Sequence, residues 1–373
     1  MAMADDSSIQ RISRLTPLGV IFDLIESQVS AVPPQVSALT DAAGRTLAAD
    51  VTTADVPPRP IALRDGFAVD ASAIAGAGPY APAALPLAAR RIDAGEPLPA
   101  GANAVLSRDA VVLRGPRADV VAEVAAGEGV LPTGGDALSQ APLRRAGERL
   151  RRLDIAVLVA AGVHAVHVRT PRVRIVRSGT SNTVLLGAAL DLLADLVARC
   201  GAVVVRDGLA FDETLRDDTV DAVIGVGGTG DGRRDAAVHT FARVGNLAAH
   251  GIAVSPGQTA AFGFSGPRPV LLIPGRLDAV LALWLLLGRL LLARLAGGVV
   301  QDASIQRPLK HKVASAIGLT ELVPVRCADG MAEPLGSGYL SFATLSRSDG
   351  WIISPAESEG FAAGSRVAVQ AWP

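Results

Sequence analysis

Between residues 171 and 302 the sequence alternates short apolar runs with amphipathic segments, and this alternation limits the possible folds more than any other feature. The apolar runs predict strands at residues 173–176, 202–205, 221–224, 252–254 and 270–273. Helical periodicity predicts helices at residues 183–200, 235–244 and 277–295. Strands that alternate with helices in this way form a mostly parallel sheet with helices on both faces.

The flanking sequence has a different character and predicts further domains. One helix is expected at residues 18–29 and a second, short one at residues 41–49. From residue 65 to residue 123, Gly and Pro interrupt short apolar runs, which is typical of a small β module. The predicted fold is therefore multidomain, α/β and β, with a mixed N-terminal linker domain (1–50 and 137–170), a β module (51–136), an α/β domain (171–302) and a C-terminal β domain (303–373).

Composition excludes several classes of protein. The 373 residues include 35 Lys and Arg against 36 Asp and Glu, so bulk charge would not hold nucleic acid or a membrane surface. The two cysteines cannot build a disulfide framework, and no signal peptide is visible, so a cytoplasmic location is expected. The most apolar run, residues 279–288, is too short to cross a bilayer.

Glycine-rich loops follow three of the predicted strands, at the edge where parallel α/β sheets bind ligands. These loops are residues 177–182, 225–232 and 274–276. Glycine lets backbone N–H groups approach an anion, and a following helix N-terminus adds a favourable dipole. One such loop is usually only a turn, but three in one sheet favour a ligand that carries phosphate or another anion.

Two common nucleotide motifs do not fit this chain. Residues 225–230 formally match G-x-G-x-x-G, yet they lie in the middle of the predicted sheet, which argues against a nicotinamide dehydrogenase. A Walker loop is excluded because Gly-Lys-Ser/Thr does not occur.

Four aspartates lie in glycine-rich or irregular stretches: Asp65, Asp136, Asp231 and Asp235. Carboxylates in such places can hold Mg²⁺ against a phosphate. Aspartate is also common in turns and helix caps, and the residues alone leave both readings open. The five histidines show no metal-binding spacing and are interpreted as structural or surface residues.

The order of short motifs along the chain resembles that of the molybdopterin molybdenumtransferases of the MoeA type, which include the gephyrin E domain. Residues 64–69, Arg-Asp-Gly-Phe-Ala-Val, are similar to the family's Met-Asp-Gly-Tyr-Ala-Val. Residues 227–235 resemble its glycine segment with the acidic residue that follows, and residues 273–276 its Leu-Pro-Gly-Asn-Pro turn. Residues 336–338 and 348–350 continue the pattern, so the resemblance extends over nearly the whole chain.

This resemblance implies an elongated homodimer in which the MogA-like α/β domain of one subunit faces the β module of the other. The implied reaction is Mg²⁺-dependent insertion of molybdate into adenylylated molybdopterin, with release of AMP. Asp65, Asp136 and Asp235 are the catalytic candidates, with Asp235 as the Mg²⁺ ligand. A MogA-type adenylyltransferase or a molybdoenzyme would be the partner. The substrate-binding candidates are Arg64, Ser178, Gly179, Thr180, Gly227, Gly228, Thr229, Gly230, Arg234, Ser255, Pro274, Gly275, Arg276 and Ser337.

Several positions depart from the family pattern. Residues 255–258 read Ser-Pro-Gly-Gln where the family has Lys-Pro-Gly-Lys, so two cations are missing. Residues 177–181 lack the two carboxylates of the family's Ser-Thr-Gly-Asp-Glu, Ala94 replaces a threonine, and Arg276 replaces an asparagine. Arginines can restore positive charge, although not with the geometry of lysine. Two functions therefore stay open: an active insertase with an altered site, and a non-catalytic relative that binds or carries molybdopterin or its molybdenum form.

Overall fold

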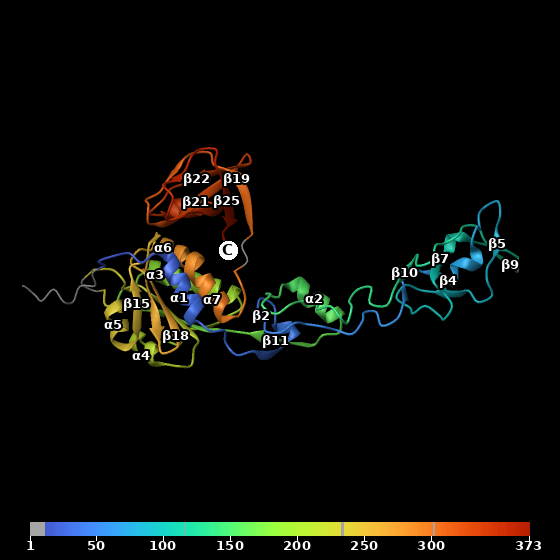
Figure 1. Cartoon of the computed structure of the whole chain (residues 1–373), viewed down its shortest axis with the longest axis horizontal. Helices are drawn as coiled ribbons and strands as arrows, with labels where there is room; N and C mark the ends of the chain where they lie inside the picture. Colours follow the sequence, from blue (N-terminus) through green and yellow to red (C-terminus); the bar gives the residue numbers. More distant parts are fainter. Residues whose placement is uncertain (1–11, 116, 233–234, 301–302) are drawn as a thin grey trace, which may run out of the picture. The chain divides into compact units, whose positions relative to one another are not determined.

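The computed structural model describes residues 12–115, 117–232, 235–300 and 303–373, which fold into two compact units (Figure 1). The first unit holds the described residues up to Ala49, then Ala146–Arg152 and Val166–Pro373. The second unit holds Asp50–Arg145 and Leu153–Ala165. The predicted multidomain α/β and β fold is confirmed. No helix within these described ranges is long and apolar enough to cross a membrane.

A six-stranded sheet organises the first unit, in the order β13-β12-β14-β18-β17-β15. The first four strands are parallel, as predicted, and β17 and β15 add an antiparallel edge that the sequence did not predict. The strands are β12 (Arg172–Arg177), β13 (Val203–Val205), β14 (Ala222–Val226), β15 (Asn246–His250), β17 (Ala261–Ser265) and β18 (Arg268–Ile273).

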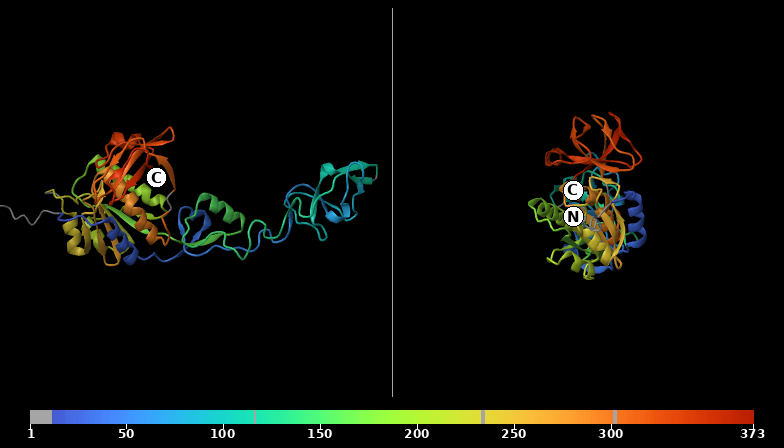
Figure 2. Two further views of the ribbon diagram at one scale, coloured as in Figure 1. Left: turned by 45° about the horizontal axis from the view of Figure 1, so that its top comes forward. Right: turned by 90° about the vertical axis from the view of Figure 1, so that its left-hand side faces the viewer.

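Helices cover both faces of this sheet (Figures 1 and 2). Alternate residues of a strand point to opposite faces, so Ile224 packs into the core under one helical layer and Val223 into the core under the other. One layer consists of α1 (Leu18–Gln28), α3 (Val184–Arg199), α6 (Leu277–Leu283) and α7 (Arg289–Leu295), with a π-helical turn (Trp284–Gly288) between the last two. The other consists of α4 (Phe211–Arg216) and α5 (Ala237–Val244).

The helix predicted at residues 41–49 is wrong. A 3-10 turn (Leu39–Asp41) is followed by Gly44, whose φ of 81° is outside the helical region, and then by strand β2 (Thr46–Leu47). The wholly buried Leu47 holds β2 in a three-stranded sheet with β1 (Gln35–Ala38) and β11 (Ala165–Arg169). Tertiary pairing therefore overrides a weak helical pattern here.

The C-terminal part of the first unit is a second sheet, in the order β16-β21-β23-β25-β19 with β22 beside β21. Its first strand, β16 (Val254–Ser255), was expected in the α/β sheet but instead pairs in parallel with β21, so that Ser255 lies opposite Glu321. The remaining elements are β19 (Ser304–Pro308), β20 (Val313–Ala314), β21 (Thr320–Ala328), β22 (Met331–Pro334), α8 (Phe342–Arg347), β23 (Gly350–Ser354), β24 (Gly360–Phe361) and β25 (Arg366–Ala371).

The second unit contains the predicted β module. Two three-stranded sheets, β6-β4-β7 and β5-β9-β8, enclose a core that includes Val69, Ile74 and Leu106. Its elements are β3 (Ile61–Ala62), β4 (Gly66–Val69), β5 (Ala83–Ala84), β6 (Arg90–Ile92), β7 (Ala104–Ser107), β8 (Val111–Arg114), β9 (Arg117–Val120), β10 (Val130–Leu131) and α2 (Arg152–Ala160).

Candidate functional site

The three predicted loops meet at the carboxyl edge of the parallel strands, and we call residues 177–182, 225–232 and 274–276 the loop cluster. A Cβ atom on Gly179 would lie 2.8 Å from the backbone nitrogen of Gly228, so these two backbones touch directly. A Cβ atom on Gly275 would lie 3.4 Å from the Cα atom of Gly227. Glycine is required at 227 and 228 because their φ angles are 96° and 72°.

Part of the hydrogen-bonding capacity of the loop cluster is used inside the protein. The Ser178 N–H donates to the carbonyl of Val226 at 3.0 Å, and the Gly227 N–H donates to the carbonyl of Ile273 at 2.8 Å. The Ser178 hydroxyl donates to the Gly227 carbonyl at 2.6 Å, whereas Thr180 is exposed. A ligand anion at this edge would therefore depend on other N–H groups than those of Ser178 and Gly227.

Asp235 shapes the turn between β14 and α5. Its Oδ2 atom accepts from the Gly232 N–H at 3.3 Å, and a Cβ atom on Gly230 would lie 2.7 Å from the same oxygen. The buried Thr229 shares a hydrogen bond of 3.0 Å with the Thr259 hydroxyl. Arg233 and Arg234, the latter predicted to bind substrate, lie outside the described residues. Asp235 thus has the turn-forming role, and its partial exposure leaves it open to solvent as well.

A Mg²⁺ ion at Asp235 would need ligands from elsewhere. Within the ranges that the structure describes, no three His, Cys, Asp or Glu side chains come together as a metal site. Mg²⁺ is commonly held by one or two carboxylates together with substrate phosphates and water. Asp235 beside glycine loops fits that arrangement if the substrate brings the phosphate oxygens.

Arg276 begins α6 at the end of β18, where its charge is already paired. Its Nε and Nη2 atoms donate to the two oxygens of Asp278 at 3.1 and 2.6 Å, and its guanidinium lies 4.3 Å from the centre of the Tyr339 ring. Asp278 is only 2% exposed and also accepts the N–H groups of Ala279 and Leu340. The hydrogen bonds that Arg276 donates to Asp278 raise the pKa of Arg276 above its usual range.

A cavity of about 550 Å³ lies beside this arginine, and we call it the β21 cavity. It is lined by residues 255–259, Pro274, Arg276, Ala279, Leu319, Glu321, Gly338 and Tyr339. Three predicted substrate-binding residues, Ser255, Pro274 and Arg276, therefore line one cavity. The predicted Ser337 is exposed and directly precedes Gly338 of the lining. Glu321 was not predicted as a site residue. The usable signal was a carboxylate placed directly before the apolar run Leu-Val-Pro-Val.

In the part of the chain that the structure describes, one buried oxygen of Glu321 has no hydrogen-bonding partner. The residue is 7% exposed, and its Oε2 atom is fully buried without a donor among the described residues. Ser354 lies directly opposite on β23, and its buried hydroxyl is likewise without a partner. A buried carboxylate in this condition is costly and is normally satisfied by a cation, a hydrogen-bond donor or a ligand.

The remaining predicted residues lie in the second unit. Asp65 accepts the Ala94 N–H at 2.9 Å and lies 3.4 Å from Arg108. Arg64 donates to the Val105 carbonyl and to the Glu128 carboxylate. The bond from Arg64 holds the pKa of Glu128 below its usual range. Asp136 is exposed in the turn after β10, where its N–H donates to the carbonyl of Val56 at 2.9 Å. The structure thus places two catalytic candidates in a different unit from Asp235.

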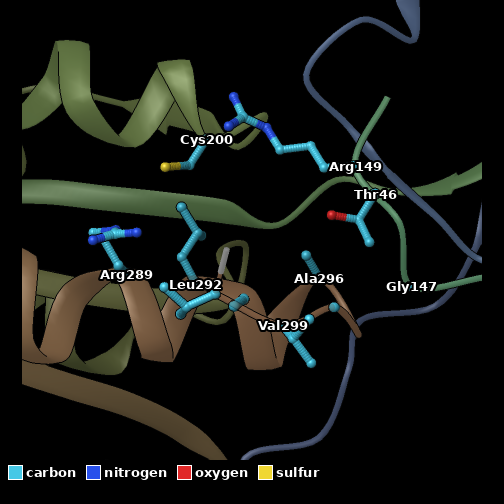
Figure 3. Close-up of a pocket in the computed structure, with 11 residues that line it drawn as sticks. Thr46, Gly147, Arg149, Cys200, Arg289, Leu292, Ala296 and Val299 are labelled. Carbon is cyan, nitrogen blue, oxygen red and sulfur yellow. The ribbon is translucent and has the colours of Figure 1, made fainter. Parts of the chain in front are cut away.

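A second cavity, of about 190 Å³, lies between α7 and the end of α3 (Figure 3). The side chains of Cys200, Arg149 and Arg289 face it, with Leu292 between the thiol and the helix, and none of the predicted site residues lines it. Burial raises the pKa of the Cys200 thiol, and the two arginines oppose this shift. A thiol with a raised pKa is a poor nucleophile at neutral pH, so this cavity is a weak candidate for chemistry.

Comparison with known proteins gives a consistent result. The model of the MoeA N-terminal region (domains I and II) matches residues 10–162, and that of the MoeA C-terminal region (domain IV) matches residues 306–372. A protein of Methanocaldococcus jannaschii whose name assigns it to molybdopterin biosynthesis is 26% identical over 371 residues, covering 89% of this chain and 90% of that protein.

Two solved structures are similar over nearly the full length. The molybdopterin biosynthesis MoeA protein of Pyrococcus horikoshii is 25% identical with a TM-score of 0.80, covering 96% of this chain and 100% of that one. A molybdenum cofactor biosynthesis protein of Pyrococcus furiosus is 22% identical with a TM-score of 0.60 over the same shares of the two chains, and this second likeness concerns the fold alone.

Proposed function

The chain belongs to the MoeA family of molybdenum cofactor biosynthesis proteins, and from this premise we propose that it inserts molybdate into adenylylated molybdopterin and releases AMP. The observation that carries the proposal is the loop cluster. Three glycine loops in backbone contact beyond parallel strands form the kind of edge that binds phosphorylated ligands. A MogA-type adenylyltransferase would supply the adenylylated substrate.

In this proposal the loop cluster holds the phosphates that join the pterin to AMP. The glycines at 179, 228 and 275 let the three loops pack closely against one another, and the N-terminus of α3 adds a favourable dipole for an anion. Asp235 is the residue that would hold Mg²⁺ against these phosphates, and the bound ion would supply charge neutralisation for the leaving AMP.

We also propose that the working site needs two chains. Asp65 and Asp136 belong to the second unit and Asp235 to the first, and the family resemblance implies that these units face each other between subunits. Mixing Asp65→Ala chains with Asp235→Ala chains should then restore activity, because one of the two sites in the heterodimer carries neither substitution. A protein that stays monomeric in light scattering while it is active would contradict this proposal.

A second candidate function is a carrier that binds molybdopterin or its molybdenum form without catalysis. The observation that favours it is the pairing of Arg276 with the buried Asp278, together with Ser255 and Gln258 in place of two family lysines. An oxyanion such as molybdate would find no uncompensated cation among the described residues that line the β21 cavity.

The deciding experiment measures AMP release from adenylylated molybdopterin with molybdate and Mg²⁺. An insertase releases AMP in step with molybdenum incorporation, and Asp235→Asn reduces the rate about tenfold or more because a carboxylate ligand is lost. Asp218→Asn, an exposed aspartate that precedes β14 and lies outside the loop cluster, is the matched control and should stay active. Ligand binding by the wild type without AMP release would support the carrier instead.

A further inference from the structure

We propose that Glu321 recognises the amino-pyrimidinone edge of the pterin, so that the β21 cavity receives the pterin ring and not an oxyanion. This inference rests on the proposed function only in taking the ligand to be a pterin. It adds a specificity residue, Glu321, and the ligand group that this residue selects.

Burial is the first observation. Glu321 lines the cavity from the start of β21, yet its residue is more than nine-tenths buried and its Oε2 atom has no donor. Ser354, opposite it across the strand pair, is one candidate donor, and its own buried hydroxyl also has no partner among the described residues. A single hydroxyl can donate one hydrogen bond, whereas a carboxylate can accept about four, so Ser354 alone would not satisfy Glu321.

The charges around the cavity are the second observation. Arg276 is the cation in the described part of the lining, and both of its bonded nitrogens are directed at Asp278 while Tyr339 covers its face. The described lining has one positive charge, Arg276, and one negative charge, Glu321, and the positive charge is already paired with Asp278 behind it. Such a cavity repels an oxyanion and attracts a cation or a set of N–H donors.

The shape of the missing partner follows from the carboxylate. Its two oxygens match two parallel N–H donors, as in carboxylate–guanidinium pairs. The 2-amino group and the N3–H of a pterin present the same pair of donors. The cavity is within the size range of small-molecule sites, and the prolines at 256 and 274 give it apolar walls for a ring. A divalent cation fits less well, because no three His, Cys, Asp or Glu side chains among the described residues come together as a metal site.

The test compares the binding of three probes to the wild-type protein: pterin, lumazine and molybdate. Lumazine is the matched ligand because an oxo group replaces the 2-amino group of pterin. We expect pterin to bind at least tenfold more tightly than lumazine, since a charge-assisted hydrogen bond is lost. Glu321→Gln should remove most of this preference, while Glu357→Gln, an exposed glutamate of the same β domain, should keep it.

Each outcome separates this inference from the proposed function. Equal affinity for pterin and lumazine overturns the inference even if AMP is released normally. A pterin preference without AMP release supports the inference and contradicts the insertase. Molybdate binding that Glu321→Gln changes, with pterin binding unchanged, also overturns the inference. If Glu321→Gln does not fold, the wild-type comparison still decides, and Ser354→Ala should leave the preference for pterin intact.

Discussion

Two carboxylates beside the β21 cavity are buried to a similar degree but have opposite surroundings. At the start of α6, Asp278 accepts two bonds from Arg276 and two from backbone N–H groups. At the start of β21, Glu321 has a buried oxygen to which no described residue donates a hydrogen bond. The fold has satisfied the first group from within, so its role is structural. We propose that the second is satisfied by a bound ligand, and this would be the physical difference between a structural carboxylate and a recognition group.

The largest effect on stability is expected at Asp278, the carboxylate whose hydrogen bonds are made within the protein. Asp278→Ala would leave the buried N–H groups of Ala279 and Leu340 without an acceptor, at a cost of about 2–4 kcal/mol in the free energy of unfolding. Urea denaturation measures this cost, with the exposed Asp231→Ala as the control. A loss equal to that of the control would mean that Asp278 is not the anchor that its hydrogen bonds indicate.

The next largest effect is expected at Gly228, where the backbones of two loops of the loop cluster pack closely. Gly228→Ala should destabilise the protein by about 1–3 kcal/mol and weaken AMP binding, because φ is 72° and the new Cβ atom would lie 2.9 Å from the Cα atom of Gly179. Gly187→Ala in the first turn of α3 is the control: its Cβ atom would meet nothing within 4 Å, so it should stabilise the helix by about 0.5–1 kcal/mol. Unchanged AMP affinity in a folded Gly228→Ala protein would mean that this loop does not bind the nucleotide and is only a turn.

At Glu321 we expect the opposite change in stability. Glu321→Gln removes a buried charge without a partner and should raise the free energy of unfolding by about 1 kcal/mol, while pterin recognition is lost. Thermal unfolding of wild type and variant, each without ligand, measures the difference. Destabilisation on the scale of Asp278→Ala would show that Glu321 already has a partner in the folded protein.

The smallest effect concerns the cavity of Figure 3, where burial acts on a thiol. Because the folded-state pKa of Cys200 is raised, its thiolate is scarcer at neutral pH than in the unfolded chain. Burial of the neutral Cys200 thiol therefore contributes to stability below the pKa that Cys200 has in the unfolded chain. This contribution is lost as the pH rises through the higher pKa that Cys200 has in the folded protein. Alkylation of Cys200, followed by mass spectrometry, should therefore be slow at pH 7 and accelerate in urea. Fast alkylation of the folded protein at pH 7 would contradict the shift.

The parallel core was predictable because its signals are local. Strand β14 is an apolar run followed by glycines, and α3 has regular periodicity with Thr183 as its cap, so residue types alone indicated both. The antiparallel pair of β15 and β17 was missed because Gly263 and small neighbours give no strand pattern, although this glycine lets the two strands approach. The pairing that sets Ser255 opposite Glu321 joins residues far apart in the chain, and no local pattern encodes it.

The most direct test of Glu321 as a recognition group is infrared difference spectroscopy of the folded protein with and without pterin. The difference between wild type and Glu321→Gln isolates the carboxylate stretching bands of this residue. We expect an ionised carboxylate band that shifts when pterin is added and does not shift with lumazine, because only pterin offers the paired N–H donors. A band that pterin leaves unmoved, while pterin binds, would contradict the account.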